Sequence, residues 1–80
     1  MFYTYILKSI NHPEQYYVGY TNDLKERFER HNKGYVKHTS KFLPWKIHAY
    51  FALQTKELAM DFEKYLKSGS GIAFRNKHFK

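Results

Sequence analysis

The sequence contains no cysteine, and it has only two prolines, four glycines and seven acidic residues. Without cysteine the chain can form no disulfide bond, no cysteine-ligated zinc site and no thiol nucleophile. No apolar run approaches the roughly 20 residues of a membrane-spanning helix. The N-terminal segment MFYTYILKS lacks the basic start and the small-residue cleavage site of a signal peptide. We therefore expect a cytoplasmic protein that does not associate with membranes.

Basic and aromatic residues are abundant by contrast. Fourteen lysines and arginines give a formal net charge of +7 in 80 residues, and such a field favours polyanionic partners. The excess is greatest at the C-terminal end, because no acidic residue follows Glu63. Eight tyrosines are mixed among the basic residues and can contact sugars, phosphates or bases. DNA is the expected partner, and the alternative is a basic protein whose charge serves solubility alone.

The first half of the chain predicts a hairpin followed by a helix. A length of 80 residues favours one domain, residues 1–80, with a single modest core. Residues 2–8 and 15–20 are rich in β-branched and aromatic side chains and predict two strands, with turn residues between them. Thr21, Asn22 and Asp23 compete to cap a helix that runs to His31 or Asn32, and Gly34 supplies its stop.

The second half predicts a loop, a third strand, a helix capped by Thr55, a glycine-serine break and a short last helix. These span residues 35–45, 46–53, 56–67, 68–71 and 72–79. The resulting order, β-β-α-β-α-α, indicates an α+β fold. Its sheet is small, three-stranded and mostly antiparallel, and helices flank it.

Two charged residues lie at the edges of apolar helix faces. Leu24, Arg27, Phe28 and His31 share one side of the first expected helix. Arg27 is unusual there, since a buried charge needs a partner; it either binds an anion, pairs with a carboxylate or extends its head to solvent. Glu63 lies at the boundary of the second helix's apolar face. Its alternative is an exposed ion pair with Lys67, an arrangement that contributes about 0.2–0.5 kcal/mol.

The motifs together resemble a known family. YTY at residues 3–5 and YVG at 17–19 are similar to the paired motif of the GIY-YIG nuclease superfamily. Further matches are TNDLKERFERHNKG with Arg27, Thr39, Pro44-Trp45, and AMDFEKYLKSGSG with Glu63. The resemblance covers essentially the whole chain and is closest to small stand-alone bacterial members, which are excinuclease-subunit-C-like. The chain departs from the pattern where Tyr3-Thr4 replaces the Gly-Ile of the first motif.

This resemblance implies the GIY-YIG fold and an endonuclease that hydrolyses DNA phosphodiester bonds with one divalent metal, Mg²⁺ or Mn²⁺. It implies low sequence specificity, since no accessory DNA-binding domain is present, and a role in DNA repair or recombination with repair proteins as potential partners. The implied catalytic residues are Tyr5, Tyr17, Tyr20, Arg27 and His31, and the implied metal ligand is Glu63. Additional nucleic-acid contacts are expected from Lys41, Lys67, Arg75 and Lys77.

The residue types fit this chemistry. A carboxylate such as Glu63 holds Mg²⁺ through oxygen, and the planar fork of Arg27 matches phosphate oxygens. Tyr5 or Tyr17 is expected to accept a proton from the attacking water, if neighbouring positive charge acidifies its phenol. Strand alternation brings Tyr5 beside Tyr17, with Gly19 expected to leave that face open to the substrate backbone. The alternative is that the tyrosines are only cross-strand aromatic pairs.

Two other functions compete with the nuclease. The first is a catalytically silent nucleic-acid-binding module with the same fold, which would hold DNA without Mg²⁺ and never nick it. The second is a protein-interaction domain that uses its aromatic surface. High salt would not abolish the binding of such a domain, whereas phosphate contacts weaken steeply with salt.

Overall fold

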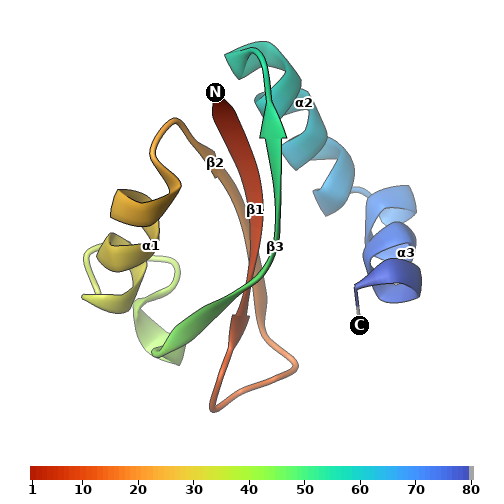
Figure 1. Ribbon diagram of the computed structural model, residues 1–80. Helices are drawn as coiled ribbons and strands as arrows, with labels where there is room; N and C mark the ends of the chain where they lie inside the picture. Colours follow the sequence, from red (N-terminus) through yellow and green to blue (C-terminus); the bar gives the residue numbers. More distant parts are fainter. Residues whose placement is uncertain (80) are drawn as a thin grey trace.

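The computed structural model describes residues 1–79, which form the expected order β-β-α-β-α-α (Figure 1). The elements are β1 Phe2–Ser9, β2 Tyr16–Thr21, α1 Leu24–Asn32, a short 3₁₀ helix Ser40–Phe42, β3 Trp45–Leu53, α2 Lys56–Lys67 and α3 Gly69–His78. The strands form one sheet in the order β2-β1-β3, and both pairs are antiparallel. The predicted α+β fold is confirmed. No helix within residues 1–79 is long and apolar enough to cross a membrane.

The sheet has a helix layer on each face, with α1 on one side and α2 and α3 on the other (Figure 1). Side chains alternate along β1, so Tyr5 and Leu7 pack with Trp45 and with the apolar residues of α1. Ile6 points to the opposite face, in a cluster with Val18, Leu66 and the phenylalanines of β3, α2 and α3. The central strand therefore supplies both halves of the core.

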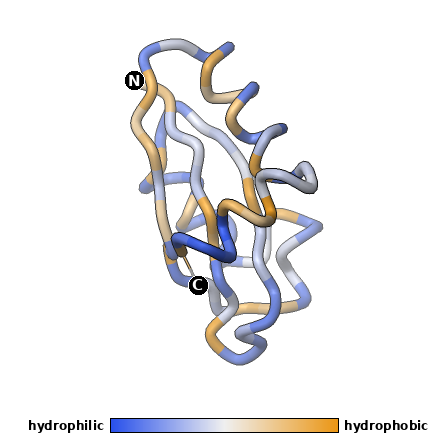
Figure 2. The backbone as a smooth tube through the Cα atoms, turned by 90° about the vertical axis from the view of Figure 1, so that its right-hand side faces the viewer, coloured by the Kyte–Doolittle hydropathy of each residue, from blue (hydrophilic) through white to orange (hydrophobic). Residues whose placement is uncertain are grey.

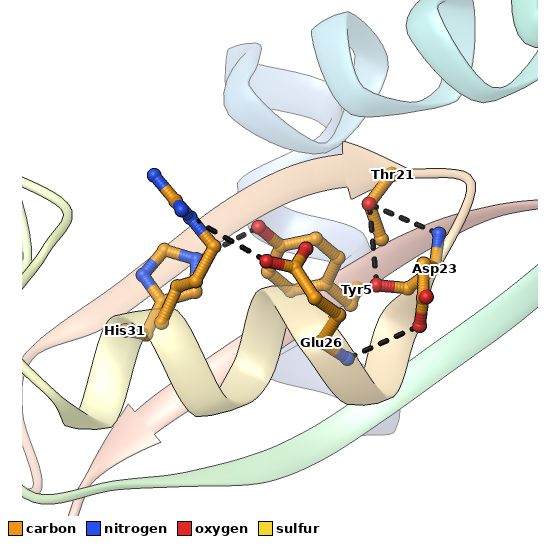
Figure 3. A network of polar contacts seen from close by, with 6 residues as sticks. Tyr5, Thr21, Asp23, Glu26 and His31 are labelled. Atoms are coloured by element: carbon orange, nitrogen blue, oxygen red, sulfur yellow. Dashed lines mark hydrogen bonds and ion pairs between the residues drawn. The ribbon is translucent and has the colours of Figure 1, made fainter.

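Asp23 is the residue that caps α1. Its Oδ1 accepts a hydrogen bond from the backbone N–H of Glu26 at 3.1 Å, and the Oγ1 of Thr21 accepts one from the N–H of Asp23 at 3.1 Å (Figure 3). Gly34 adopts a φ of 77° just beyond the helix, as expected of a C-terminal stop. The cap starts α1 three residues after β2 ends, which holds the helix close to the edge strand that carries Tyr17.

The start of α3 differs from the prediction. Ser68 ends α2 by donating its N–H to the carbonyl of Tyr65, and its Oγ accepts from the N–H of Gly71, at 3.0 and 3.2 Å. The last helix therefore begins at Gly69, and the expected start at residue 72 is wrong. The glycine-serine segment forms the first turn of α3, because a side-chain cap overcame the low helix propensity of glycine.

Gly71 should be required for the packing of α3 on α2. A Cβ at this position would lie 1.7 Å from the carbonyl oxygen of Tyr65, and this backbone atom has little freedom to move. We expect Gly71→Ala to lower the free energy of unfolding by about 1–3 kcal/mol or more. Gly69→Ala is the matched control, since nothing lies within 4 Å of its added Cβ. Urea unfolding followed by circular dichroism compares the two variants, and equal stabilities would contradict this role.

Candidate active site

Tyr5 lies at the centre of the candidate site, on the central strand of the sheet. Its side chain is 1% exposed, and its Oη lies 2.8 Å from Nε2 of His31 (Figure 3). The Tyr17 ring is 6.4 Å from the Tyr5 ring between centroids and 5.0 Å from the His31 ring. The two motif tyrosines and the histidine therefore form one aromatic cluster beneath α1.

Gly19 makes room for this cluster. It lies directly opposite Tyr5 in the β1–β2 pair, and a Cβ there would lie 2.7 Å from the Tyr5 Oη and 3.0 Å from Cε2 of Tyr17. The space above the glycine is filled by protein, so the expectation that it admits the substrate backbone is wrong. The motif glycine is needed because two large rings converge over the same strand position.

A chain of hydrogen bonds fixes the tautomer of His31. The Thr39 hydroxyl donates to the carbonyl of Val36 at 3.2 Å, so its oxygen accepts from His31 Nδ1–H at 2.8 Å. Nε2 then carries the lone pair, and the Tyr5 O–H donates to it. Trp45 holds the loop in place by donating its Nε1–H to the carbonyl of Thr39 at 2.8 Å.

The ionisation states of His31 and Tyr5 agree with a hydrogen bond in which Tyr5 is the donor. Burial first, then Arg27 and Arg30, lower the pKa of His31 to about 4, so the ring is neutral at pH 7. Burial raises the pKa of Tyr5 to about 12, although the polar contact with Arg27 offsets part of the rise. Tyr5 therefore keeps its proton and directs it toward His31.

Arg27 lies in the middle of α1, beside both phenols. Its contact with Tyr5 is the largest cause that raises its pKa above the ordinary value, and Tyr17 adds to the effect. Within residues 1–79 no carboxylate forms an ion pair with Arg27, and its buried Nε has no hydrogen-bond partner. The guanidinium thus lies beside two phenols with its Nε unused within residues 1–79.

The C-terminal half of α2 brings a carboxylate and an amine close to the two motif tyrosines. Glu63 Oε2 lies 2.9 Å from Lys67 Nζ, and the Glu63 side chain is only 19% exposed. Lys67 Nζ lies 5.9 Å from the centre of the Tyr17 ring, and Glu63 is close enough to raise the pKa of Tyr5. The ion pair named as the alternative is present, but the carboxylate is more buried than in an ordinary surface pair.

Glu63 fits a hydrated divalent metal. Within the described residues, no three His, Asp or Glu side chains are grouped to form a protein cage for an ion. Mg²⁺ commonly keeps several waters and binds one or two carboxylates together with substrate phosphates. A partly exposed carboxylate that already holds the ammonium of Lys67 suits this mode, because one cation can replace the other.

The remaining candidates are spread more widely. Tyr20 is half-buried and, by strand alternation, lies on the face of β2 opposite Tyr17. His31 is completely buried, so it positions Tyr5 and has no access to a substrate in solution. Lys41 is exposed in the 3₁₀ helix, and Lys77 is exposed on α3. The geometry groups Tyr5, Tyr17, Arg27, Glu63 and Lys67, with His31 buried against Tyr5.

The role of Thr39 is visible only in the folded chain. It bonds to His31 across eight residues, and no single helix or strand joins the two positions. The family pattern identifies Thr39 in the sequence. Its hydrogen bond to His31, however, depends on the conformation of the loop between the two residues.

Comparison with known proteins places the GIY-YIG catalytic domain on residues 1–76. A UPF0213 protein of Bacillus licheniformis is 42% identical over 52 residues, which cover 64% of this chain and 54% of the relative. A UPF0213 protein of Streptococcus pyogenes serotype M3 is 38% identical over 66 residues, which cover 81% and 70%. The chain thus spans about half the length of the Bacillus relative. No solved structure matches the chain.

Acid should destabilise the protein through His31. The unfolded ring binds a proton below about pH 6.5, whereas the native ring resists protonation until about pH 4. The contribution of His31 to the free energy of unfolding is complete above pH 6.5 and is lost as the pH falls toward 4. This loss is on the order of 3 kcal/mol. Urea denaturation at several pH values measures it.

His31→Gln should remove this part of the pH dependence, and His38→Gln should retain it, because His38 is exposed in the loop. An NMR titration of the His31 ring with a midpoint near the ordinary histidine value would contradict the assignment.

Proposed function

Because the chain belongs to the GIY-YIG catalytic domain family, a nuclease-type family, we propose that it is a divalent-metal-dependent endonuclease that hydrolyses DNA with low sequence specificity. The net charge of +7 favours such a substrate. The observation that carries the proposal is the position of Arg27. It lies beside two motif tyrosines, has an unused buried Nε and, within residues 1–79, pairs with no carboxylate.

Arg27 would bind the scissile phosphate. Negative charge grows on the non-bridging oxygens as water attacks, and a guanidinium can donate two parallel hydrogen bonds to them. The guanidinium lies beside the phenols of Tyr5 and Tyr17 before the substrate arrives. A donor fixed in advance stabilises the transition state more effectively than one that must reorganise.

Tyr17 is the better candidate for the general base. Tyr5 directs its proton to His31, and burial raises its pKa to about 12, so it is a poor proton acceptor. Tyr17 is half-buried, and both Lys67 and Arg27 lie beside it. Tyr17 would act as the phenolate, which takes the proton of the attacking water and becomes the neutral phenol, and the two cations would pair with the phenolate before that transfer. Tyr5 would then act as a positioning residue for Arg27.

Glu63 would hold Mg²⁺ or Mn²⁺ through its carboxylate oxygens. A bound ion of this kind polarises the phosphate and stabilises the leaving oxygen. Lys67, released from its ion pair with Glu63, would be free to contact a phosphate next to Tyr17. The carboxylate and the lysine therefore have complementary roles at the mouth of the site.

The cellular role, the protein partners and the location are inferred from the sequence alone. A role in DNA repair or recombination, repair proteins as partners, and a cytoplasmic location remain predictions. Tyr20, Lys41 and Lys77 are proposed to extend the surface that contacts DNA. The competing function is a silent nucleic-acid-binding module, which would share the fold and the charge but lack turnover.

Nicking of supercoiled plasmid tests the proposed activity. We expect the protein to nick DNA with Mg²⁺ or Mn²⁺ and to stop when EDTA is added. Glu63→Gln should abolish the metal-dependent cleavage because a neutral amide binds the ion poorly. Glu57→Gln, an exposed acid on the same helix, should retain it. Salt-sensitive binding without any nicking would favour the silent module instead.

The two motif tyrosines should behave differently on loss of their hydroxyls. Tyr17→Phe should lower the single-turnover cleavage rate by about 10²–10⁴-fold while the packing of its ring is kept. Tyr5→Phe leaves the buried Nε2 of His31 without a donor, which costs about 1–3 kcal/mol of stability. Cleavage kinetics together with urea unfolding separate the two effects. Full activity of Tyr17→Phe would remove its hydroxyl from the mechanism.

A further inference from the structure

Basic side chains gather around Tyr16, on the face of the sheet opposite Tyr17. Lys8 is the direct partner of Tyr16 in the β1–β2 pair, and Lys46 is the partner of Lys8 in the β1–β3 pair. Arg75 reaches Tyr16 from α3, and the His48 ring lies 5.5 Å from the Tyr16 ring. All three strands and the last helix therefore contribute to one cluster.

Two cations of this cluster lie beside the same tyrosine ring. Lys8 Nζ and Arg75 Cζ are each 5.7 Å from the centre of the Tyr16 ring, so they are separated by no more than about twice that distance. The Nε of Arg75 is buried and has no hydrogen-bond partner within residues 1–79. In that part of the chain, ion pairs form at Glu26 and Glu63, on α1 and α2.

No side-chain carboxylate of the described residues is therefore ion-paired with the cluster. A cation above a tyrosine ring gains about 0.5–1 kcal/mol at an exposed site, but the ring does not neutralise its charge. Lys8 and Arg75 carry like charges beside the same ring, and these charges repel one another. An anion bound by both groups would offset their charge.

His48 has a structural role within the cluster. Its Nε2–H donates to the carbonyl of Phe79, which attaches the end of α3 to β3. Burial, followed by Lys8, Lys46 and Arg75, lowers the pKa of His48, so its ring adds no charge at neutral pH. The charged groups of the cluster are therefore the two lysines and Arg75, and His48 helps to hold α3 where Arg75 faces Tyr16.

We propose that Lys8, Lys46 and Arg75, with the hydroxyl of Tyr16, form a second phosphate-binding site for the nucleic-acid backbone. Guanidinium, ammonium and phenol groups are all common donors to backbone phosphates. The site itself requires only that the protein binds nucleic acid. Its relation to the cleaved bond rests on the proposed function.

The chain connects this cluster to the candidate active site. Tyr16 and Tyr17 are consecutive on β2, an edge strand, so their side chains point to opposite faces of the same edge. Lys67 lies beside Tyr17, and Ser68 leads directly into α3, which carries Arg75. Figure 2 shows the hydrophilic end of α3 in front of the strands. A strand of nucleic acid that follows this edge would meet both sites, which favours a polymer over a free phosphate ion.

Binding to duplex DNA in EDTA tests the site without any requirement for cleavage. For each lost phosphate contact, the slope of log Kobs against log salt should become shallower by about 0.9. We expect this change in Lys8→Gln and in Arg75→Gln, with Arg75→Lys restoring most of the affinity. Lys56→Gln removes the same charge from the exposed start of α2 and should leave the slope unchanged.

Slopes for Lys8→Gln and Arg75→Gln equal to that of Lys56→Gln would overturn the second site, even if the protein cleaves DNA. Conversely, the expected slopes without cleavage would support the second site and count against the nuclease. Lys8→Gln keeps the test valid should circular dichroism show that Arg75→Gln is unfolded.

The ¹⁵N resonance of Arg75 Nε distinguishes binding of a nucleic-acid phosphate from binding of a free phosphate ion. A short single-stranded oligonucleotide should shift this resonance at concentrations where inorganic phosphate, matched in phosphate content, leaves it in place. An equal shift with inorganic phosphate would assign the site to free phosphate and overturn the backbone proposal. No shift with either probe would overturn the site itself.

Discussion

The structure depends on the burial of the Tyr5 hydroxyl together with the His31 ring. Two polar groups removed from water must bond to each other or to other protein groups, since unpaired burial costs several kcal/mol. Their 2.8 Å contact joins the central strand to α1, and Thr39 satisfies the second ring nitrogen. The angle of α1 on the sheet, the conformation of the following loop and the neutral state of His31 follow from this requirement.

The same requirement explains the residues around it. Gly19 has no side chain because the phenol of Tyr5 and the ring of Tyr17 fill the space above it. Arg27 lies beside these phenols without a carboxylate partner in residues 1–79, an arrangement that favours an external anion. A site of this kind is built on a rigid strand and a docked helix, so its groups are positioned before a substrate binds.

The two helix layers give the β2 edge two chemically different sides. The side with Tyr17 combines Arg27 and Lys67 with Glu63, which is two positive charges and one negative charge. On the other side, cations lie around Tyr16, and none of them forms an ion pair with a side-chain carboxylate of the described residues. Because adjacent strand residues point in opposite directions, consecutive tyrosines serve both sides. One edge strand can therefore contribute to reaction and to backbone binding.

The order of strands and helices, the cap at Thr55 and the positions of Arg27 and Glu63 could all be predicted from the sequence, because they depend on residues within about one helical turn or strand. The sequence left three candidates for the cap of α1, and the structure selected Asp23. The start of α3 and the role of Gly19 could not be predicted in the same way. The chain of hydrogen bonds from Tyr5 through His31 to Thr39 and the cluster at Tyr16 depend on contacts between residues 8 to 59 positions apart. Such contacts form only when the sheet and its helices pack, so the sequence by itself determined the elements and the candidate chemistry, and the tertiary structure decided which groups meet.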